Sequence, residues 1–434
     1  MRSGPGRRPS AQADGRARGH RGGSRGRWVD GGPGSGPGGA RVLVIEKTPR
    51  AGTKILASGG TRCNLTTTLE PRLAARLFGK QGERFLRGPF QALSPQALRQ
   101  SFSEWGVPTM TAPLEKVFPV SGRARDVRDA LLRVTTAAGA EVRYDTPLQN
   151  LAAPEDGGST WTLQCADGEV LESKAVILAS GGKSYPRTGT TGDGYGWLQG
   201  LGLPLTQPRP SLVPLRSSAK WVQDLAGVSL QDCELLLQGA DGQQIVRRRR
   251  PMLFTHRGLS GPGPMDLSGR ISAMGENPQV DLRADLLPDI DRESLRDELL
   301  SLAAQPGRPS TAKLLKGKLP KRLVGPVFAA CQLPIDLPAA ALSRAQRHAL
   351  VEALKRLPLP VGGTLGYDQA EVTAGGLSLS ALDSRTMQTH DHPNLFVCGE
   401  LLDLDGPIGG LNFQAAFSTG FLAGRAAALS IAGK

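Results

Sequence analysis

The stretch Gly399-Glu-Leu-Leu-Asp-Leu-Asp-Gly-Pro-Ile-Gly-Gly-Leu-Asn-Phe-Gln414 decides the fold of this 434-residue chain. It directly follows an apolar, strand-like segment, residues 395–398. A second glycine-rich segment, Lys54-Ile-Leu-Ala-Ser-Gly-Gly-Thr-Arg-Cys-Asn64, follows a short apolar strand that ends in Glu46. Glycine lets main-chain N–H groups approach a ligand closely, so two such loops after strands are typical of a site for a large, phosphate-carrying cofactor. Together they indicate a flavin enzyme.

The N-terminal segment offers an acid, a bare loop and two cations. In dinucleotide folds an acidic residue at the position of Glu46 accepts hydrogen bonds from ribose hydroxyls, although a strand end often carries a merely solvated charge. Gly59 and Gly60 expose N–H donors, and Lys54 and Arg62 beside them are able to offset pyrophosphate charge. The alternative is an ordinary glycine turn with two surface cations. The spacing from Glu46 favours the cofactor.

The C-terminal segment and a third glycine-rich turn add further candidates. Glu400 is predicted to bond the ribityl or phosphate region, and Gly409 and Gly410 open the last helix, whose positive N-terminal end would face an electron-rich flavin edge. The alternative is a loop with a helix cap. Residues 179–182, Ala-Ser-Gly-Gly, follow an apolar strand and either pass beneath a cofactor or form a simple strand exit.

Composition narrows the class of protein. The net charge is +14, of which residues 1–40 contribute +6 through eight arginines and two aspartates. The five cysteines lie far apart without a Cys-x-x-Cys pair, which favours a reducing, cytoplasmic compartment and argues against a disulfide framework or a metal site. No secretory signal and no run of about 20 apolar residues is present, so we expect no membrane span.

The chain divides into four parts. Residues 1–39 are rich in Gly, Arg and Pro and are predicted to be disordered. Residues 40–190 and 361–434 are predicted to form the two parts of a nucleotide-binding domain. Residues 191–360 form an insertion between them, which is β-rich over 203–275 and helical over 285–356.

Two features of the insertion have an open interpretation. His256, in a polar turn, is a candidate proton donor or substrate contact, whereas a lone histidine is more often structural. Four consecutive arginines, residues 247–250, are typical of a solvated strand edge, with a phosphate-binding patch as the alternative. No other catalytic constellation stands out, so the chemistry would belong to a cofactor.

These segments resemble the BaiN/RdsA family of bacterial NAD(P)/FAD-dependent oxidoreductases, which have a glutathione-reductase-like FAD fold. The resemblance runs from about residue 40 to 434 and implies an α/β fold, with a Rossmann-like FAD/NAD(P)-binding domain interrupted by an inserted β-rich and helical domain. It implies that Glu46 binds ribose. It also implies that FAD is lined by Lys54, Ser58, Gly59, Gly60, Arg62, Cys63, Asn64, Ala179, Gly181, Gly182, Glu400, Gly409, Gly410 and Asn412.

The chain departs from this family upstream of Glu46. Members begin with an apolar strand, a Gly-x-Gly-x-x-Gly loop and a helix, but here the glycines from Gly34 to Gly39 follow no strand and precede no helix. Gly34 lies only 12 positions before Glu46, since 46 − 34 = 12, against about 20 in the working motif. We therefore expect the first strand and phosphate loop to be missing, and we hypothesise that residues 1–39 are a frameshifted or misassigned start.

The expected reaction is hydride transfer between NAD(P)H and an unknown organic substrate by way of bound FAD. The alternatives are a flavin oxidase of a small amine and an RNA-binding flavoprotein. Aromatic residues make up only 5% of the chain, which argues against a stacking platform for nucleic acid. We therefore expect a small-molecule substrate as the partner and no nucleic acid.

Overall fold

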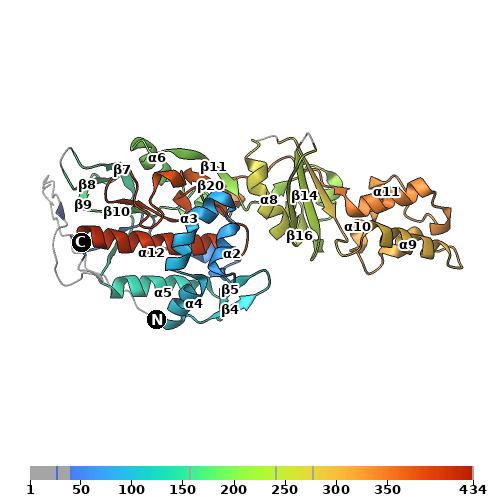
Figure 1. Ribbon diagram of the computed structural model, residues 1–434, viewed down its shortest axis with the longest axis horizontal. Coiled ribbons are helices and arrows are strands. Elements are labelled where there is room, and N and C mark those ends of the chain that lie inside the picture. Colours follow the sequence, from blue (N-terminus) through green and yellow to red (C-terminus); the bar gives the residue numbers. More distant parts are fainter. Residues whose placement is uncertain (1–25, 28–39, 156–157, 240–241, 276–277, 433–434) are drawn as a thin grey trace, which may run out of the picture.

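The computed structural model describes residues 26–27, 40–155, 158–239, 242–275 and 278–432. Of residues 1–39, which are predicted to be disordered, Gly26–Arg27 are described and form the short strand β1, so the prediction is wrong there. Residues 1–25 and 28–39, with the glycines from Gly34 to Gly39, lie outside the described residues. Figure 1 shows an elongated molecule in which the chain runs from a large α/β unit through a β-rich middle to a helical end, and then returns. The last helix, α12 (Leu411–Ile431), runs through the α/β unit.

Two parallel strand pairs form the centre of the α/β unit. β2 (Leu43–Ile45) pairs with β6 (Glu141–Arg143), and β10 (Val176–Leu178) pairs with β21 (Leu395–Val397). Within the described residues the two pairs are not hydrogen-bonded to each other.

The first of these strands is less buried than its sequence predicts. Val42 is 46% exposed and Val44 is 39% exposed, although an uninterrupted apolar run predicts a buried strand. The reason is that β2 has a ladder partner on one edge only, so its other edge carries backbone groups with no strand partner among the described residues.

Helices cover these strands. Their bounds are α1 Thr53–Ala57, α2 Pro71–Arg76, α3 Gly79–Ala92, α4 Pro95–Glu104, α5 Ala124–Ala137 and α6 Asp193–Gly200. α4 begins where the Ser94 hydroxyl accepts a hydrogen bond from the N–H of Ala97, with Pro95 at the first helical position. The amphipathic pattern over residues 125–138 predicts a helix, and the glycine-rich segment at 189–194 is predicted to open another near residues 195–200; both are confirmed, as α5 and α6.

Two further sheets belong to the same unit. An outer sheet has the order β1-β9-β8-β7, and a three-stranded sheet has the order β3-β5-β4. Their bounds are β1 Gly26–Arg27, β7 Leu148–Ala152, β8 Trp161–Cys165, β9 Val170–Ser173, β3 Thr66–Thr67, β4 Thr109–Ala112 and β5 Lys116–Pro119. The turn at Gly168, where φ is +89°, joins β8 to β9 as the Asp-Gly signal predicts.

An antiparallel pair connects this unit to the insertion. β11 (Leu205–Ser211) leads out and β20 (Val372–Leu377) leads back, with Leu205 opposite Leu377, Ser211 opposite Val372 and a shift in register between Thr206 and Arg209. Because the outgoing and returning strands are hydrogen-bonded to each other, the two units are joined by a ladder rather than by loose linkers.

The insertion contains two four-stranded sheets, ordered β12-β17-β16-β13 and β15-β14-β18-β19. Their bounds are β12 Leu215–Arg216, β13 Ser229–Leu230, β14 Glu234–Gly239, β15 Gln244–Arg249, β16 Met252–Thr255, β17 Gly258–Ser260, β18 Val280–Asp285 and β19 Leu357–Pro358. α7 (Lys220–Asp224) and α8 (Pro262–Ser272) pack against them, and α8 lies between the sheets and the α/β unit in Figure 1.

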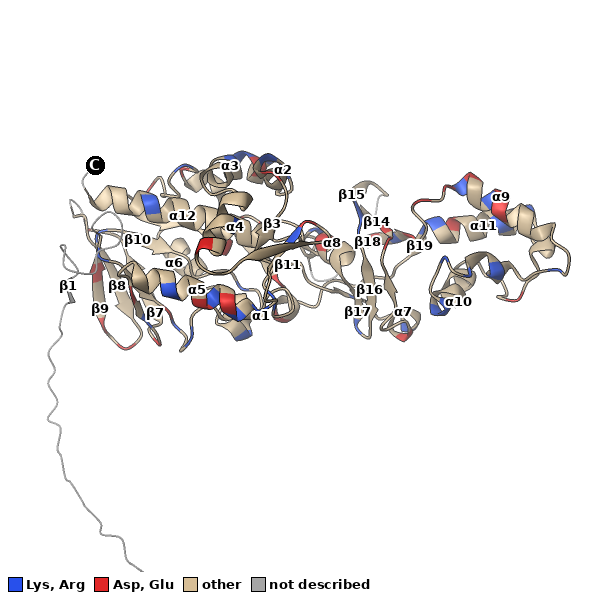
Figure 2. Cartoon of the chain, turned by 90° about the horizontal axis from the view of Figure 1, so that it is seen from below, with Lys and Arg blue, Asp and Glu red and all other residues tan. Residues whose placement is uncertain are grey.

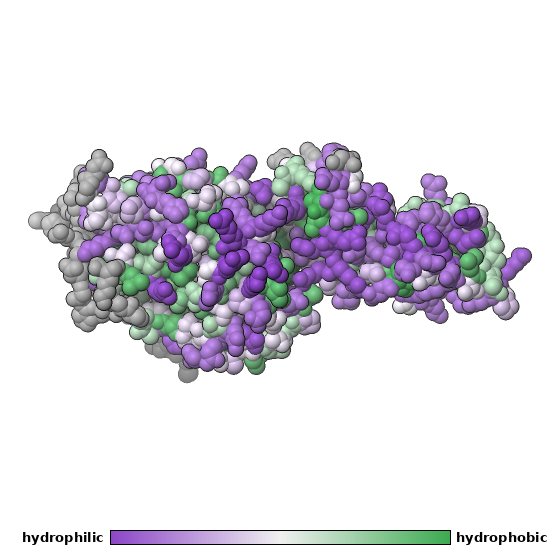
Figure 3. Space-filling view, in the orientation of Figure 1, coloured by the Kyte–Doolittle hydropathy of each residue, from purple (hydrophilic) through white to green (hydrophobic). Residues whose placement is uncertain are grey.

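The far end is helical. α9 (Arg292–Ala303), α10 (Lys321–Ala330) and α11 (Arg344–Lys355) pack around leucine-rich residues that form one continuous core with the sheets of the insertion. Figure 2 marks both basic and acidic residues along these helices, and Figure 3, which views the molecule from another side, shows a largely hydrophilic surface at this end. Short 3₁₀ turns lie at Pro186–Thr188, Thr311–Leu315, Ala339–Ala341, Tyr367–Gln369, Leu379–Ala381 and Gly399–Leu401.

The hydrophobic interior has two main parts. One cluster contains only residues between Leu215 and Leu359, and the other is built from the α/β unit on both sides of the insertion. Tyr195, Leu198 and Leu203 belong to the second cluster. The division into domains stays a prediction, and we propose that the insertion begins at the end of β11 rather than at residue 191.

Candidate cofactor-binding site

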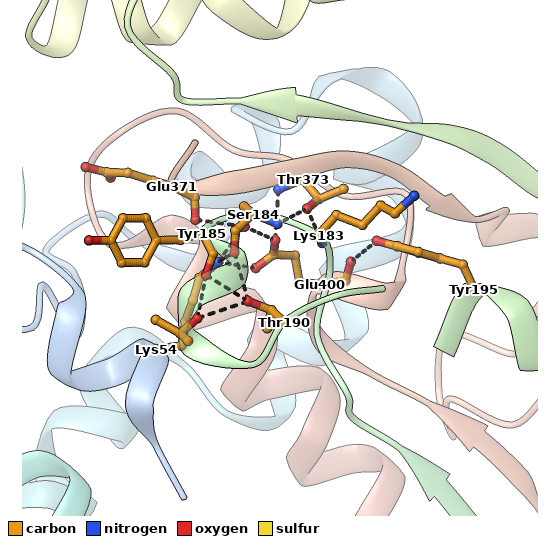
Figure 4. Close-up of polar contacts among 10 residues, drawn as sticks. Lys54, Lys183, Ser184, Tyr185, Thr190, Tyr195, Glu371, Thr373 and Glu400 are labelled. Atoms are coloured by element: carbon orange, nitrogen blue, oxygen red, sulfur yellow. Dashed lines mark hydrogen bonds and ion pairs between the residues drawn. The ribbon is translucent and has the colours of Figure 1, made fainter. Parts of the chain in front are cut away.

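A buried polar network joins the two glycine-rich segments (Figure 4). The Glu400 Oε1 atom accepts hydrogen bonds from the Ser184 hydroxyl at 2.6 Å and from the Thr373 N–H at 2.8 Å. The Lys54 ammonium group donates to the Ser184 carbonyl oxygen at 2.9 Å and lies 3.6 Å from Glu400 Oε2. Lys54 comes from α1 and Glu400 from the turn after β21, so the network connects the predicted ends of one site.

Gly182 is required by this network. A Cβ atom at Gly182 would lie 2.4 Å from Thr373 Oγ1 and 2.6 Å from Glu400 Oε1. The neighbouring Gly181 has φ +76°, and Ala179 is an exposed residue just beyond β10. The small residues at 179–182 therefore let the strand exit approach Glu400, while their contact with a cofactor stays a prediction.

The sequence did not single out Ser184 or Thr373. Ser184 lies within the family-like segment of residues 177–191, which was the only available signal, and Thr373 carries no signal of its own. Conversely, Lys54 and Glu400 were predicted to face a ligand, yet much of their hydrogen-bonding capacity is used within the protein.

The loop after α1 has an unusual backbone. Gly59, Gly60, Thr61 and Cys63 all have φ between +54° and +68°. Two of them carry side chains, and left-handed residues of that kind are strained and cluster at functional sites. Gly60 has no atom within 4 Å of a Cβ position, so its main chain borders open space, whereas a Cβ at Gly59 would lie 2.9 Å from the Asn64 nitrogen.

Side chains on either side of this loop hold it in place. The Ser58 hydroxyl donates to the Ile55 carbonyl, the Asn64 Oδ1 atom accepts from the Val117 N–H at 3.0 Å, and the Arg62 guanidinium lies 4.5 Å above the Phe118 ring. Cys63 is buried, and burial raises the pKa of its thiol to about 11. The thiol is therefore protonated and unreactive near neutral pH.

Glu46 closes β2 and turns the chain. Its Oε1 atom accepts hydrogen bonds from the Thr48 N–H at 2.9 Å and the Thr48 hydroxyl at 2.8 Å. The side chain is half-buried, and its second carboxylate oxygen, Oε2, is the atom left to meet a ribose hydroxyl. The predicted contact with ribose stays a prediction.

The start of α12 lies directly against the N-terminal segment. Gly410, with φ +80°, approaches so closely that a Cβ atom there would lie 2.0 Å from the Thr66 carbonyl oxygen. Asn412 holds the preceding loop, because its side chain accepts from the Gly406 N–H and donates to the Gly406 carbonyl, both at 2.8 Å. The stretches before residue 67 and after residue 398 are therefore neighbours in space.

The main chain at the start of α12 is open to a ligand such as FAD. Gly409, with φ +147°, has only the Leu114 carbonyl oxygen near its Cβ position, at 3.7 Å, so it leaves bare main chain beside the N–H groups of the first turn of α12. Gly60 and Gly409 therefore each leave main chain that no side chain covers, which fits a bound cofactor. Among the described residues the short strands β1 and β2 precede Glu46, but no helix does.

Other predicted features lie outside this network. His256 is exposed in the turn between β16 and β17. Of the four consecutive arginines, Arg247 pairs with Glu234 at 3.2 Å and Arg249 with Asp289 at 2.6 Å, so these two belong to an ion-paired strand edge.

All five cysteines are free. Ligand atoms of Cys165, Asp167 and Glu169 lie within 4.8 Å of one another. However, both acidic side chains are already engaged, by the Glu169 N–H and by Arg143, so we assign no metal there. In the described part of the chain no helix combines the length and apolarity needed to cross a membrane.

Comparison with known proteins places the chain in a family. A family model described as "HI0933-like protein Rossmann domain" matches residues 35–426. A 3-dehydro-bile acid delta(4,6)-reductase from Clostridium scindens is 29% identical over 90% of this chain and 93% of its own length. A ribosomal RNA dihydrouridine synthase from Escherichia coli is 31% identical over 89% of this chain and 91% of its own length.

Among solved structures, a 3-ketosteroid delta1-dehydrogenase from Sterolibacterium denitrificans is similar, with a TM-score of 0.47 and 12% identity over 91% of this chain and 96% of that one. Similarity this distant says nothing about the reaction.

Proposed function

Because the chain belongs to the HI0933-like Rossmann family and is an FAD-dependent oxidoreductase, we propose that it reduces a carbon–carbon double bond conjugated to a carbonyl group, with NAD(P)H as the electron source. The names of two relatives support the substrate class. One names a reduction at the delta(4,6) positions of a 3-dehydro bile acid, and the other names the synthesis of dihydrouridine. Both products arise when hydrogen is added to an unsaturated ring that also carries a carbonyl group.

The single observation that carries the proposal is the convergence of the two glycine-rich segments. Gly410 lies against Thr66, and Lys54 lies beside Glu400, so bare main chain from both ends of the sequence borders one place. Bound FAD would supply a hydride to the substrate there after reduction by a nicotinamide. The first-turn N–H groups of α12 would stabilise negative charge on the flavin edge.

Each residue of the site has a proposed task. Glu46 would accept a hydrogen bond from ribose, and the Gly59–Gly60 main chain with Arg62 would face phosphate. Ser58, Cys63, Asn64 and the residues at 179–182 would shape the walls, with Asn412 fixing the loop before α12. Lys54 and Glu400 would hold the walls together as well as contact the ribityl chain.

The test uses purified protein with added FAD, in the absence of oxygen. NADPH and NADH are tried separately as reductants, and flavin bleaching is followed by absorbance. The reduced protein is then mixed with 2-cyclohexen-1-one, a 3-oxo-Δ4-steroid or uridine. Reoxidation by one of these ring substrates supports the proposal. Flavin that only an amine reduces, and that oxygen rapidly reoxidises, would establish the oxidase alternative instead.

Uridine within RNA is the second candidate substrate, because two relatives are named ribosomal RNA dihydrouridine synthases. Lys313, Lys316 and Lys321 are exposed on the helical end and could contact phosphates. Binding of an rRNA fragment that weakens steeply with salt, together with dihydrouridine in the product, would support it. Reduction of free uridine or the enones without any RNA affinity would exclude it.

A further inference from the structure

A group of charged side chains lies where the α/β unit meets the insertion, next to the network around Glu400, which it joins through the Glu371 carbonyl oxygen that accepts from the Ser184 hydroxyl (Figure 4). We call Lys116, Arg250, Asp266 and Glu371 the seam cluster. Lys116 begins β5, Arg250 follows β15, Asp266 lies in α8, and Glu371 precedes β20. Two of these elements belong to the α/β side and two to the insertion, so the cluster exists only when both are assembled.

Asp266 is the most buried member. Its side chain is 1% exposed, its Oδ1 atom accepts a hydrogen bond from the Ile408 N–H at 2.8 Å, and its Oδ2 atom has no hydrogen-bond partner among the described residues. Burial raises the pKa of this carboxyl, and the nearby Arg250 opposes that effect. A buried carboxylate oxygen without a donor is uncommon in folded proteins.

Arg250 is also incompletely satisfied. Its side chain is 19% exposed, and its buried Nη1 atom has no hydrogen-bond partner in the described part of the chain. Its two carboxylate neighbours are distant, with Asp266 at 3.8 Å and Glu115 at 3.6 Å. The guanidinium group therefore keeps donors for another acceptor.

The adjacent arginine shows the contrast. Arg249 donates to Asp232 Oδ1 at 2.8 Å and to Asp289 Oδ1 at 2.6 Å on the outer surface. Arg249 is thus ion-paired on the surface, where its role is structural. Arg250 instead lies inside the seam, with an Nη1 donor that has no hydrogen-bond partner among the described residues. The two residues form a matched pair for experiment.

Lys116 and Glu371 are the other two charged members of the seam cluster. Desolvation lowers the pKa of Lys116, and the charges of Arg250 and Arg62 act in the same direction, while Glu371 and Asp266 oppose them. Glu371 is an exposed residue, but protein atoms close to its carboxylate desolvate it and thereby raise its pKa. The two cations and the two carboxylates of the seam cluster balance in formal charge, so the feature that favours a ligand with an acceptor oxygen is the Arg250 Nη1 donor, which has no hydrogen-bond partner among the described residues.

The cluster also borders the proposed flavin site. The Ile408 N–H that reaches Asp266 immediately precedes Gly409 and Gly410 at the start of α12. Glu115, beside Arg250, lies in a turn with Leu114, whose carbonyl oxygen is the atom nearest to the Cβ position of Gly409. Both Leu114 and Glu115 have positive φ values, +64° and +55°.

We propose that Arg250 and Lys116 bind the carbonyl oxygen of the substrate and stabilise the negative charge that develops on it, with Asp266 holding Arg250 in position. This inference rests on the proposed function, because hydride addition to a conjugated double bond moves electron density onto that oxygen. Arg250 and Lys116 are then binding residues for an enolate-like oxygen, and Asp266 is a positioning residue.

The test measures binding of 4-nitrophenolate, a planar ring with a negatively charged oxygen, to the FAD-loaded protein by isothermal titration calorimetry. 4-Nitroanisole, which has the same ring without an ionised oxygen, is the control ligand and should bind at least about tenfold more weakly. Arg250→Gln should weaken phenolate binding by about tenfold or more, and Lys116→Gln by a smaller factor. Arg249→Gln should leave it unchanged.

Asp266→Asn separates a positioning role from a merely structural one. The amide keeps an oxygen for the Ile408 N–H but no longer offers Arg250 a charged partner, so the variant should stay folded and bind the phenolate more weakly than the unmodified protein. Unchanged or tighter phenolate binding in Asp266→Asn would overturn its assignment as a positioning residue, and equal binding of phenolate in Arg250→Gln would overturn the assignment of Arg250. Thermal unfolding of each variant checks folding, and Lys116→Gln carries the test if Arg250→Gln does not fold.

These outcomes are distinct from those of the reduction assay. Loss of phenolate binding in Arg250→Gln without any enone or uridine reduction would sink the proposed function alone. Enone reduction that is unaffected by Arg250→Gln, together with unchanged phenolate binding, would sink the seam-cluster assignment alone.

Discussion

The Gly410→Ala substitution adds only one methyl group, yet it should strongly destabilise the folded chain. Gly410 has φ +80°, a conformation that costs a residue with a side chain about 1–2 kcal/mol. The added Cβ would lie 2.0 Å from the Thr66 carbonyl oxygen, so the backbone of one segment must move, at a cost of about 1–3 kcal/mol. We therefore expect a loss of about 2–5 kcal/mol in the free energy of unfolding.

Gly424→Ala is the matched control in the same helix. Gly424 has no atom within 4 Å of its Cβ position, and replacing a helix-interior glycine by alanine should stabilise α12 by about 1 kcal/mol. Urea unfolding followed by far-ultraviolet circular dichroism compares the two midpoints, and the visible absorbance of the purified proteins compares their flavin content. A Gly410→Ala midpoint equal to that of Gly424→Ala would refute the close approach of α12 to Thr66.

Three further outcomes are expected. Glu400→Gln should lower the free energy of unfolding by about 1–3 kcal/mol, because Ser184, Thr373 and Lys54 lose a charged acceptor. The control Glu298→Gln, at an exposed ion pair, should change the free energy of unfolding by less than about 1 kcal/mol. Thermal unfolding that shows the larger loss of stability in Glu298→Gln would contradict this. Burial raises the pKa of Cys63 to about 11 and those of Cys233 and Cys398 to about 12, so the folded thiols stay protonated while unfolded ones ionise, and stability should fall as pH rises above about 8.5. Cys398→Ala should make that fall shallower by about 1.4 kcal/mol per pH unit in urea unfolding between about pH 9 and 10, and an unchanged slope would count against it. His256→Ala should change the free energy of unfolding by less than about 0.5 kcal/mol, because the side chain is exposed. If His256 transfers a proton to the substrate as predicted, the variant should show normal flavin reduction but turnover reduced by about a hundredfold or more.

Local structure was largely predictable from the sequence. The spacing of apolar residues predicted the helix α5 and the strand β8, and the Asp-Gly signal predicted the turn at Gly168. These features depend on neighbours in the chain, which the sequence displays directly. The exposure of Val44 was not predicted, because it depends on which strand lies alongside β2.

The site was predictable in its glycines but not in its side-chain partners. Positions such as Gly409 and Gly410 can be predicted from the sequence, because glycine-rich main chain after a strand is typical of a cofactor site. Thr373, Arg250 and Asp266 give no such signal, since their importance comes from contacts between elements that lie far apart in the chain. Whether Glu46 binds ribose stays a prediction, although its bonds to Thr48 show that it also shapes the turn after β2.

The division of the central strands into two separate parallel pairs has a consequence for how the molecule opens. In the described residues the β2–β6 ladder shares no backbone hydrogen bond with the β10–β21 ladder, so the two pairs are held together only by the packing of helices and side chains. Amide protons of Leu43–Ile45 should therefore exchange with deuterium well before those of Leu395–Val397, because the N-terminal pair can detach as an independent cooperative unit.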